Sequence, residues 1–279
     1  MGFLKTLISM DVEITVALAL YVLSGALAIV HAVRRRGRVL RVAALAVLAA
    51  GLVANVLWIV DAWHTLGHPP FAEVYGCLVL LALCVGVVSL SLDVTTGIRF
   101  LGGVSSLSAA GILVFSVRYV ADVRPLPPSL HSLYFAPHVL GYFIAYGALT
   151  LAGLAGLVFI VVRVARPRAK SRSPFLEGLR AWIHGAALVG FPFLTLGLLL
   201  GAFWAQASGG SYWSWDPKES WALVTWLLVV VWLHLWRQHS RGVPAAVVMV
   251  LAATALWFTF LGVGLLPAAH DSYHVYLAR

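Results

Sequence analysis

Tryptophans crowd one short stretch of this sequence, GGSYWSWDPKESW (209–221). Trp213, Trp215 and Trp221 lie in it and Trp204 shortly precedes it, in a chain with 11 tryptophans. Aromatic side chains bury large flat apolar areas, so the stretch predicts a surface for a planar ligand such as a porphyrin or a quinone ring. The alternative is an interfacial aromatic belt, although the tryptophans of such a belt are normally spread over several helix ends.

Three of the 10 histidines stand where they could hold iron. His138 lies in YFAPHVLGYF, at the start of one apolar run, and His270 lies in LLPAAHDSYHVY, just past the end of another. Two imidazoles on opposite faces of a flat macrocycle are what bis-His haem ligation requires. His234 lies inside an apolar run, about 20 Å deeper than Trp221 by helical rise, and an ionisable group within a membrane span is a functional candidate.

The other histidines are weaker candidates for metal ligands. His64 and His68 are four residues apart and could bind a metal, but Gly67 and Pro69 argue against a helix that would align them. Surface or interfacial roles are predicted for three histidines near basic or apolar borders: His31, His184 and His239.

The elements that position these residues are membrane helices. Of the 279 residues, 62% are hydrophobic and 10% are charged, whereas a soluble domain is about half apolar and a quarter charged. Apolar runs long enough to cross a bilayer recur along the whole chain. They predict an all-α polytopic membrane protein with a single domain over 1–279 and eight spans: 11–33, 41–60, 73–92, 100–120, 135–163, 184–205, 219–236 and 244–266.

The net charge of +9 is a topology signal. Lys and Arg concentrate in alternate linkers, above all 34–41 and 163–180. Positive-inside bias therefore predicts that these linkers face the cytoplasm, while both termini and the tryptophan loop, about 205–219, lie outside the inner (cytoplasmic) membrane. The same topology brings His138 and His270 to the face that carries the loop. Nucleic-acid binding is excluded, since its basic footprint would gather on one soluble face.

Local signals complete the prediction. DPKE marks a helix start, with Asp216 as N-cap, Pro217 in the first turn and Glu219 three residues after the cap; the acidic pair could serve capping alone. The segment near 166–176 reads as a linker that forms a short interfacial helix. Cys77 and Cys84, seven residues apart on one helix, are too distant for a disulfide and are expected in the core.

The segment GFPFLTLGLLLGAFWAQASGGSYWSWDPKESWALVTWLLVVVWLHLWR (190–237) resembles the tryptophan-rich haem-handling segment of system II cytochrome c biogenesis proteins, the CcsA/ResC family. Residues 68–83, 126–149 and 260–273 are similar to further segments of that family. The chain departs from the pattern at Gly209, where the family usually has a tryptophan.

The resemblance implies a component of a cytochrome c haem-attachment machine, or haem lyase. Such proteins carry haem b across the membrane and present it to the Cys-x-x-Cys-His of an apocytochrome c, beside a CcsB/ResB/Ccs1-type membrane partner. Carried over to this chain, His138 and His270 become the external axial ligands, with His274 as the alternative to His270, and His234 becomes the ligand of a deeper site. The implied haem platform comprises Trp213, Trp215, Asp216 and Trp221. No nucleophile or acid–base pair is visible.

Three other functions remain open. A HemX-like membrane protein would serve the regulation of haem synthesis, and an exporter would move haem without attaching it. A quinone-binding subunit of a respiratory complex would need histidine pairs within one four-helix core. The histidines here are instead divided between loops and one deep position, which argues against that third function.

Overall fold

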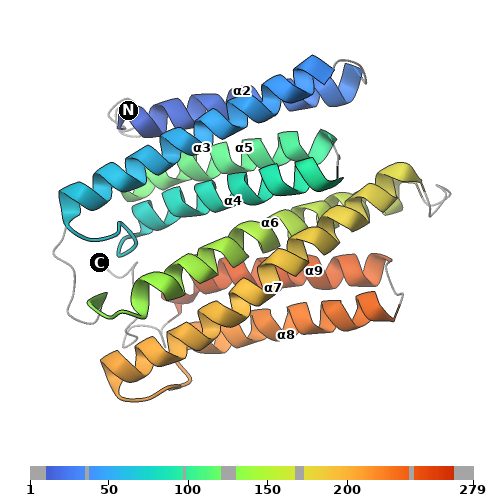
Figure 1. Cartoon of the computed structure of the whole chain (residues 1–279). Helices are drawn as coiled ribbons and strands as arrows, with labels where there is room; N and C mark the ends of the chain where they lie inside the picture. Colours follow the sequence, from blue (N-terminus) through green and yellow to red (C-terminus); the bar gives the residue numbers. More distant parts are fainter. Residues whose placement is uncertain are drawn as a thin grey trace. The chain divides into compact units, whose positions relative to one another are not determined.

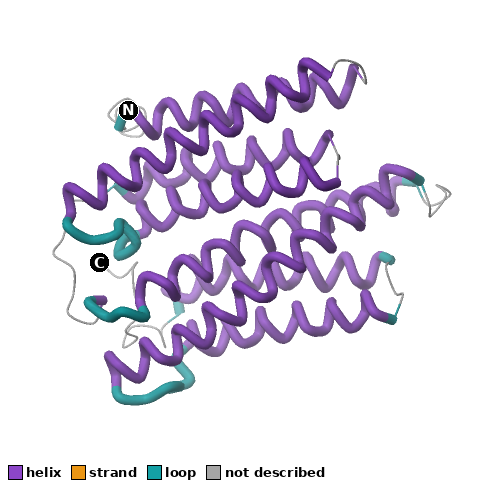
Figure 2. The backbone as a smooth tube through the Cα atoms, viewed as in Figure 1, coloured by secondary structure: helices purple, strands orange, loops and turns teal. Residues whose placement is uncertain are grey.

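Eight helices in the described part of this computed structural model are long and apolar enough to cross a membrane. The structure describes residues 11–34, 38–96, 99–120, 130–166, 173–238 and 242–266, and within these ranges it contains helices and loops and no strand (Figure 1, Figure 2). The predicted all-α polytopic architecture is thus confirmed. The chain divides into two compact units, Met1–Pro127 and Pro128–Arg279. The single domain predicted for 1–279 stays a prediction.

Unit 1 contains four consecutive membrane helices. They are α2 (Val12–Arg34), α3 (Arg38–Leu66), α4 (Val74–Thr96) and α5 (Arg99–Ser116), the last followed by the 3-10 turn η1 (Val117–Tyr119). α2 packs against α3 and α5, and α4 packs against α5. A Cβ atom added at Gly25 of α2 would lie 2.7 Å from the Leu107 side chain of α5, so these helices approach closely through a small residue, as membrane helices often do.

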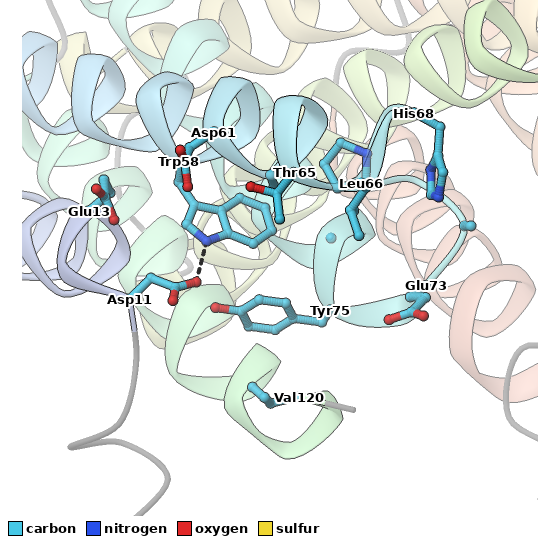
Figure 3. Close-up of a pocket in the computed structure, with 14 residues that line it drawn as sticks. Asp11, Glu13, Trp58, Asp61, Thr65, Leu66, His68, Glu73, Tyr75 and Val120 are labelled. Carbon is cyan, nitrogen blue, oxygen red and sulfur yellow. Dashed lines mark hydrogen bonds between the residues drawn. The ribbon is translucent and has the colours of Figure 1, made fainter. Parts of the chain in front are cut away.

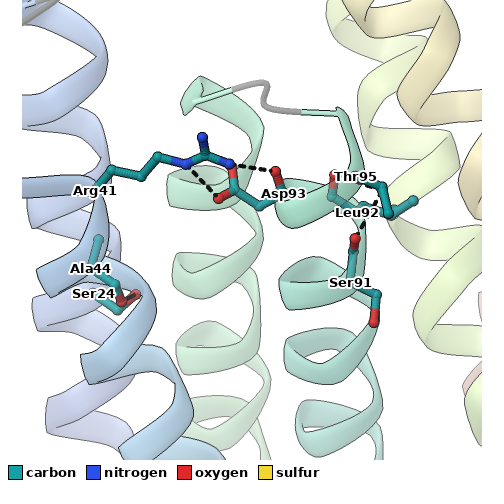
Figure 4. A network of polar contacts seen from close by, with 7 residues as sticks. All are labelled: Ser24, Arg41, Ala44, Ser91, Leu92, Asp93 and Thr95. Atoms are coloured by element: carbon teal, nitrogen blue, oxygen red, sulfur yellow. Dashed lines mark hydrogen bonds and ion pairs between the residues drawn. The ribbon is translucent and has the colours of Figure 1, made fainter. Parts of the chain in front are cut away.

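An ion pair joins two helices of unit 1. Arg41 of α3 and Asp93 of α4 approach to 3.6 Å between Nε and Oδ2, and Arg41 also donates to the Asp93 backbone carbonyl at 2.9 Å (Figure 4). The pair lies near the basic linker between α2 and α3. A charge within a membrane span is costly unless it is paired, so Arg41 compensates the buried Asp93 carboxylate.

Unit 2 contains the remaining four spans. They are α6 (Phe135–Ala165), α7 (Pro174–Gly209), α8 (Pro217–Arg237) and α9 (Val243–Trp257). α9 continues without a break as the π-helix η3 (Phe258–Gly262) and the 3-10 turn η4 (Val263–Leu265). The interface between α6 and α7 is the most extensive among the described helices, and α9 packs against both α6 and α8.

The start of α7 corrects the sequence prediction. A span at 184–205 was expected, whereas α7 is one continuous helix of 36 residues that begins at Pro174. Most of the short interfacial helix expected near 166–176 lies outside the described residues. The start signal of α7 is local: the Ser173 side chain accepts a hydrogen bond from the Leu176 N–H, and Pro174 occupies the first turn. Hydropathy marks only the part of such a helix that is apolar, so the polar first turns were missed. The internal Pro192 is tolerated, as is common in membrane helices.

Two of the histidines with predicted surface or interfacial roles are covered, wholly or in part, by the protein. His31 of α2 is only 4% exposed, and neither of its ring nitrogens has a hydrogen-bond partner among the described residues. His184 lies well inside α7, where its ring stacks on Trp236 of α8 with centroids 4.6 Å apart. His239 lies outside the described residues. Cys77 and Cys84 form no disulfide with each other and both are buried, as predicted.

Candidate functional site

The tryptophan loop is held at both of its ends. α7 ends at Gly209, and Gly210 adopts the left-handed conformation with φ of 78° that terminates many helices. At the other end the Asp216 carboxylate accepts from the Lys218 N–H at 2.8 Å, and Glu219 reaches back to the Asp216 N–H at 3.2 Å. This capping box confirms the helix start predicted from DPKE.

Glu219 does more than cap α8. Its Oε2 atom also accepts from the backbone N–H of Ser214 at 2.8 Å and from the Ser214 hydroxyl at 3.2 Å. One carboxylate therefore fixes the backbone on both sides of Trp215. Asp216 and Glu219 thus both have structural roles, and their hydrogen bonds determine the geometry of the loop.

Trp215 is presented outward by a strained backbone. It is the only non-glycine residue with positive φ, at 59°, among the described residues, and its side chain is 70% exposed. The left-handed conformation costs an L-residue roughly 1–2 kcal/mol. Trp213 packs edge-on against it, with ring centroids 5.7 Å apart. The Trp213 indole nitrogen is buried without a hydrogen-bond partner among the described residues.

His138 occupies a niche between α6 and α7. Its Nδ1 lies 2.8 Å from the carbonyl oxygen of Gly197. Because a carbonyl only accepts, Nδ1 carries the proton, and the neutral ring then has its lone pair on Nε2, the form that ligates a metal. The ring stacks on Trp204 at a centroid distance of 6.0 Å and meets Tyr142 edge-on at 4.9 Å.

Two glycines make this niche possible. A Cβ atom at Gly201 would lie 2.6 Å from His138 Cε1, and one at Gly197 would lie 2.8 Å from the Tyr142 ring. Sequence reasoning missed both glycines, although the spacing in GLLLG (197–201) is the small-xxx-small pattern by which membrane helices approach closely. It also missed Tyr142.

A row of aromatic contacts joins the start of α6 to the tryptophan loop. Tyr134 stacks on Phe203 with ring centroids 5.6 Å apart, and Phe203 meets Tyr212 of the loop edge-on at 5.9 Å. Trp204, the neighbour of Phe203, is 2% exposed and contacts Phe135 as well as His138. The structure thus brings His138 and the loop to the same end of unit 2.

Trp221 connects α8 to the end of α9. Its ring lies 4.5 Å from that of Phe258, the first residue of the π-helix. The predicted ligand His270 and its alternative His274 lie outside the described residues, which end at Leu266.

His234 is placed apart from His138. It lies in the last turn of α8, at the opposite end of unit 2 from the loop, and its side chain is exposed. Val231 and Leu227, one and two turns earlier on α8, are also exposed, at 47% and 48%. His234 therefore lies on a face of α8 that no described residue of unit 2 covers.

In unit 1, α3 ends at Leu66, so His64 and His68 do not share a helix.

Among the described residues, no three His, Cys, Asp or Glu side chains lie close enough to hold one metal ion.

Comparison with known proteins identifies the family. The model of the cytochrome C assembly protein family matches residues 71–270, a range that includes His138, the tryptophan loop, His234 and His270. The cytochrome c biogenesis protein CcsA of Chlamydomonas reinhardtii is 33% identical over 227 residues, which cover 78% of this chain and 64% of that protein. CcsA of Synechococcus elongatus is 27% identical over 265 residues, covering 76% and 81%.

A solved structure has a similar fold. The cytochrome c heme lyase CcmF superposes with a TM-score of 0.60 at 22% identity, over 95% of this chain and 48% of CcmF. This chain thus spans about half of CcmF and about two thirds of the Chlamydomonas relative. The family model covers well over half of the sequence, and the chain belongs to the cytochrome C assembly protein family.

Proposed function

We propose that this protein carries haem b across the membrane and presents it to apocytochrome c for thioether formation, as a subunit of a haem lyase complex. The observation that carries the proposal is the niche of His138, in which Nδ1 donates to the Gly197 carbonyl and Gly201 leaves room for the ring. Metal-ligating histidines almost always donate their second N–H in this way. Membership of a cytochrome c assembly family supports the same function.

Two features of the loop fit a porphyrin. Trp215 offers an exposed indole on a backbone fixed by Glu219, and such a face suits a flat apolar ring. Trp213 carries a buried N–H without an acceptor among the described residues, and a haem propionate is a suitable acceptor. Buried donors without a partner are rare in folded proteins, so this N–H is suited to pairing with an anionic group of a ligand.

The chain contributes positioning rather than acid–base chemistry. Bound haem supplies the vinyl groups to which the two thiols of apocytochrome c add. His138, through Nε2, and His270, or alternatively His274, would hold the haem iron. Trp213, Trp215 and Trp221 cover the ring edge and exclude water, while Asp216 fixes the loop that carries them.

A membrane partner completes the deeper site. His234 is exposed on α8 beside Leu227 and Val231, so an imidazole at this place can be shared with a second protein. We assign this face to a CcsB/ResB/Ccs1-type partner that supplies the opposing ligand. The basic linkers then lie in the cytoplasm and the tryptophan loop lies outside the inner membrane.

The proposal is tested by purifying the protein together with its partner and recording the haem absorbance spectrum. We expect a low-spin spectrum in the unaltered complex and its loss in His138→Ala, with partial recovery when imidazole is added. His64→Ala is the matched control, because His64 is an exposed histidine of unit 1 and should leave the spectrum unchanged. An unaltered spectrum in His138→Ala would contradict the assignment.

Strains with and without this protein separate the rival functions. A haem lyase subunit produces covalently attached cytochrome c, which retains haem stain after denaturation. An exporter delivers haem outside without attachment. Deletion of a HemX-like protein would change the amount of haem precursors and leave the attachment of haem to cytochrome c intact.

A further inference from the structure

A small internal cavity of about 20 Å³ lies between the four membrane helices of unit 1. Its lining includes His31 of α2, Arg41 of α3, Ser89 and Asp93 of α4, and Gly102 of α5. The ion pair between Arg41 and Asp93 forms part of the wall (Figure 4). The cavity contains none of the residues assigned to haem, so the inference drawn from it is independent of the proposed function.

Two polar side chains at this cavity are buried without a hydrogen-bond partner among the described residues. His31 is 4% exposed and Ser89 is fully buried, and both ring nitrogens of His31 and the Ser89 hydroxyl lack a partner there. The Nε atom of Arg41 also makes no hydrogen bond, because its contact with Asp93 is an ion pair at 3.6 Å. A buried polar atom without a partner is costly, so these groups indicate a ligand that forms hydrogen bonds with them.

A larger cavity of unit 1 differs in this respect. It has a volume of about 360 Å³ and lies where α3 ends and α4 begins (Figure 3). The indole N–H of Trp58 in its wall donates to the Asp11 carboxylate, and no described residue of its lining has a buried side-chain polar atom that lacks a partner. Buried donors and acceptors without partners therefore distinguish the small cavity from the large one.

The size and the lining of the small cavity select the ligand. A water molecule needs at least about 10–15 Å³ of space and roughly two to four polar partners, so about 20 Å³ admits one water. Arg41 and Ser89 offer donors, the Asp93 carboxylate accepts, and a neutral histidine ring has one nitrogen of each kind. No three His, Cys, Asp or Glu side chains in the described ranges lie close enough to hold a metal ion, and the Asp93 carboxylate would repel an anion.

We propose that this cavity binds a single water molecule, which bridges His31 to the ion pair of Arg41 and Asp93. The His31 ring lies within electrostatic range of the Asp93 carboxylate. The water accepts hydrogen bonds from the Arg41 Nε–H and the Ser89 hydroxyl, and it donates to the Asp93 carboxylate and to the unprotonated ring nitrogen of His31. It thus joins α2 to α3 and α4, and His31 is a hydrated histidine although the protein covers it.

A structure of the full-length protein in lipid nanodiscs, at a resolution that shows ordered water, tests the proposal directly. We expect one density peak within hydrogen-bond distance of both His31 and Ser89, and its loss in the double variant His31→Phe/Ser89→Ala. Ser105→Ala is the matched control, because Ser105 is a buried serine whose hydroxyl donates to the Leu101 carbonyl of its own helix at 2.8 Å; the peak should remain there. The proposal is overturned if the unaltered protein shows no peak, or if the peak persists in the double variant or scatters as a heavier ion.

A double-mutant cycle supplies a thermodynamic test. His31 and Ser89 make no direct side-chain hydrogen bond, so coupling between their polar groups requires a shared ligand. In the unfolding equilibrium constant, measured in mixed micelles, His31→Phe and Ser89→Ala should be coupled by more than about threefold. His31→Phe and Ser105→Ala should act independently. Coupling below that value in the first pair, or equal coupling in both pairs, overturns the proposal. If phenylalanine prevents folding, as read by circular dichroism, His31→Leu completes the same cycle.

Discussion

The Nδ1 atom of His138 lies 2.8 Å from the carbonyl oxygen of Gly197, and Gly201, one turn further along α7, faces the same ring. The histidine comes from α6 and both glycines come from α7. The orientation of a candidate iron ligand is therefore set by how closely two membrane helices approach.

The first prediction concerns Gly201. In Gly201→Ala the new Cβ would lie 2.6 Å from His138 Cε1, so the ring must turn and the hydrogen bond to Gly197 is lost. Haem affinity should fall about 10- to 100-fold, as it does when an outer partner of a metal-bound histidine is removed. Haem titration followed by absorbance measures this change.

Gly111→Ala provides the control for that substitution. Gly111 lies in α5, and a Cβ there meets nothing within 4 Å. The alanine should stabilise the helix by up to about 1 kcal/mol and leave haem affinity unaltered. Equal affinities in the two alanine variants would contradict the role given to the niche.

The second prediction separates strain from function at Trp215. Replacing this residue by Gly removes the penalty of its left-handed backbone, roughly 1–2 kcal/mol, and removes the exposed indole as well. Thermal unfolding should occur at an unchanged or higher temperature, while cytochrome c maturation should fall. Trp63→Ala, which removes a half-exposed indole from α3, should affect neither maturation nor haem binding. A Trp215→Gly protein with full maturation activity would show that the loop does not need this indole.

The third prediction concerns Glu219, which accepts from Ser214 and Asp216. Glu219→Gln replaces a charged acceptor by a neutral one, and the capping interaction should weaken by about 1 kcal/mol. The loop N–H groups should then exchange with deuterium faster, as read by mass spectrometry of the loop peptide. Glu177→Gln, which breaks only the Glu177–Arg180 pair of α7, should leave exchange in the loop unchanged.

The fourth prediction concerns the ion pair in unit 1. Arg41→Leu leaves the Asp93 carboxylate, whose side chain is 8% exposed, without its cation, and the free energy of unfolding should fall by about 3 kcal/mol. Because removing both charges removes the desolvation cost as well, Arg41→Leu/Asp93→Leu should recover most of that loss. Chemical unfolding in mixed micelles checks both values. A double variant that is less stable than the single one would argue for further partners of Asp93.

The positions of the spans were accessible from sequence because bilayer thickness demands long apolar runs, and seven of the eight helices lie close to their predicted ranges. The start of α8 was also predictable, since Asp216, Pro217 and Glu219 form a cap from neighbouring residues alone. The early start of α7 was not predictable, because hydropathy does not report on helical turns that lie beyond the apolar run.

The candidate site was predicted only in part. His138 and the tryptophans are recognisable by residue type, but the pairing of His138 with Gly197 depends on the register between α6 and α7, which periodicity along one helix does not determine. The burial of His31 likewise depends on neighbouring helices rather than on its own sequence context.

The π-helix at Phe258–Gly262 makes spacing along the last span differ from that of an ordinary α-helix. A π-bulge accommodates one additional residue within a helix, and each α-helical residue rotates the chain by about 100° about the axis. Deleting one residue between Phe258 and Gly262 would therefore let this segment close as an ordinary α-helical turn, with Val263–Leu265 kept close to their present orientation about the axis. The bulge thus tolerates the loss of one residue, a loss that an ordinary α-helix would pass on to its following turns as a rotation of about 100°.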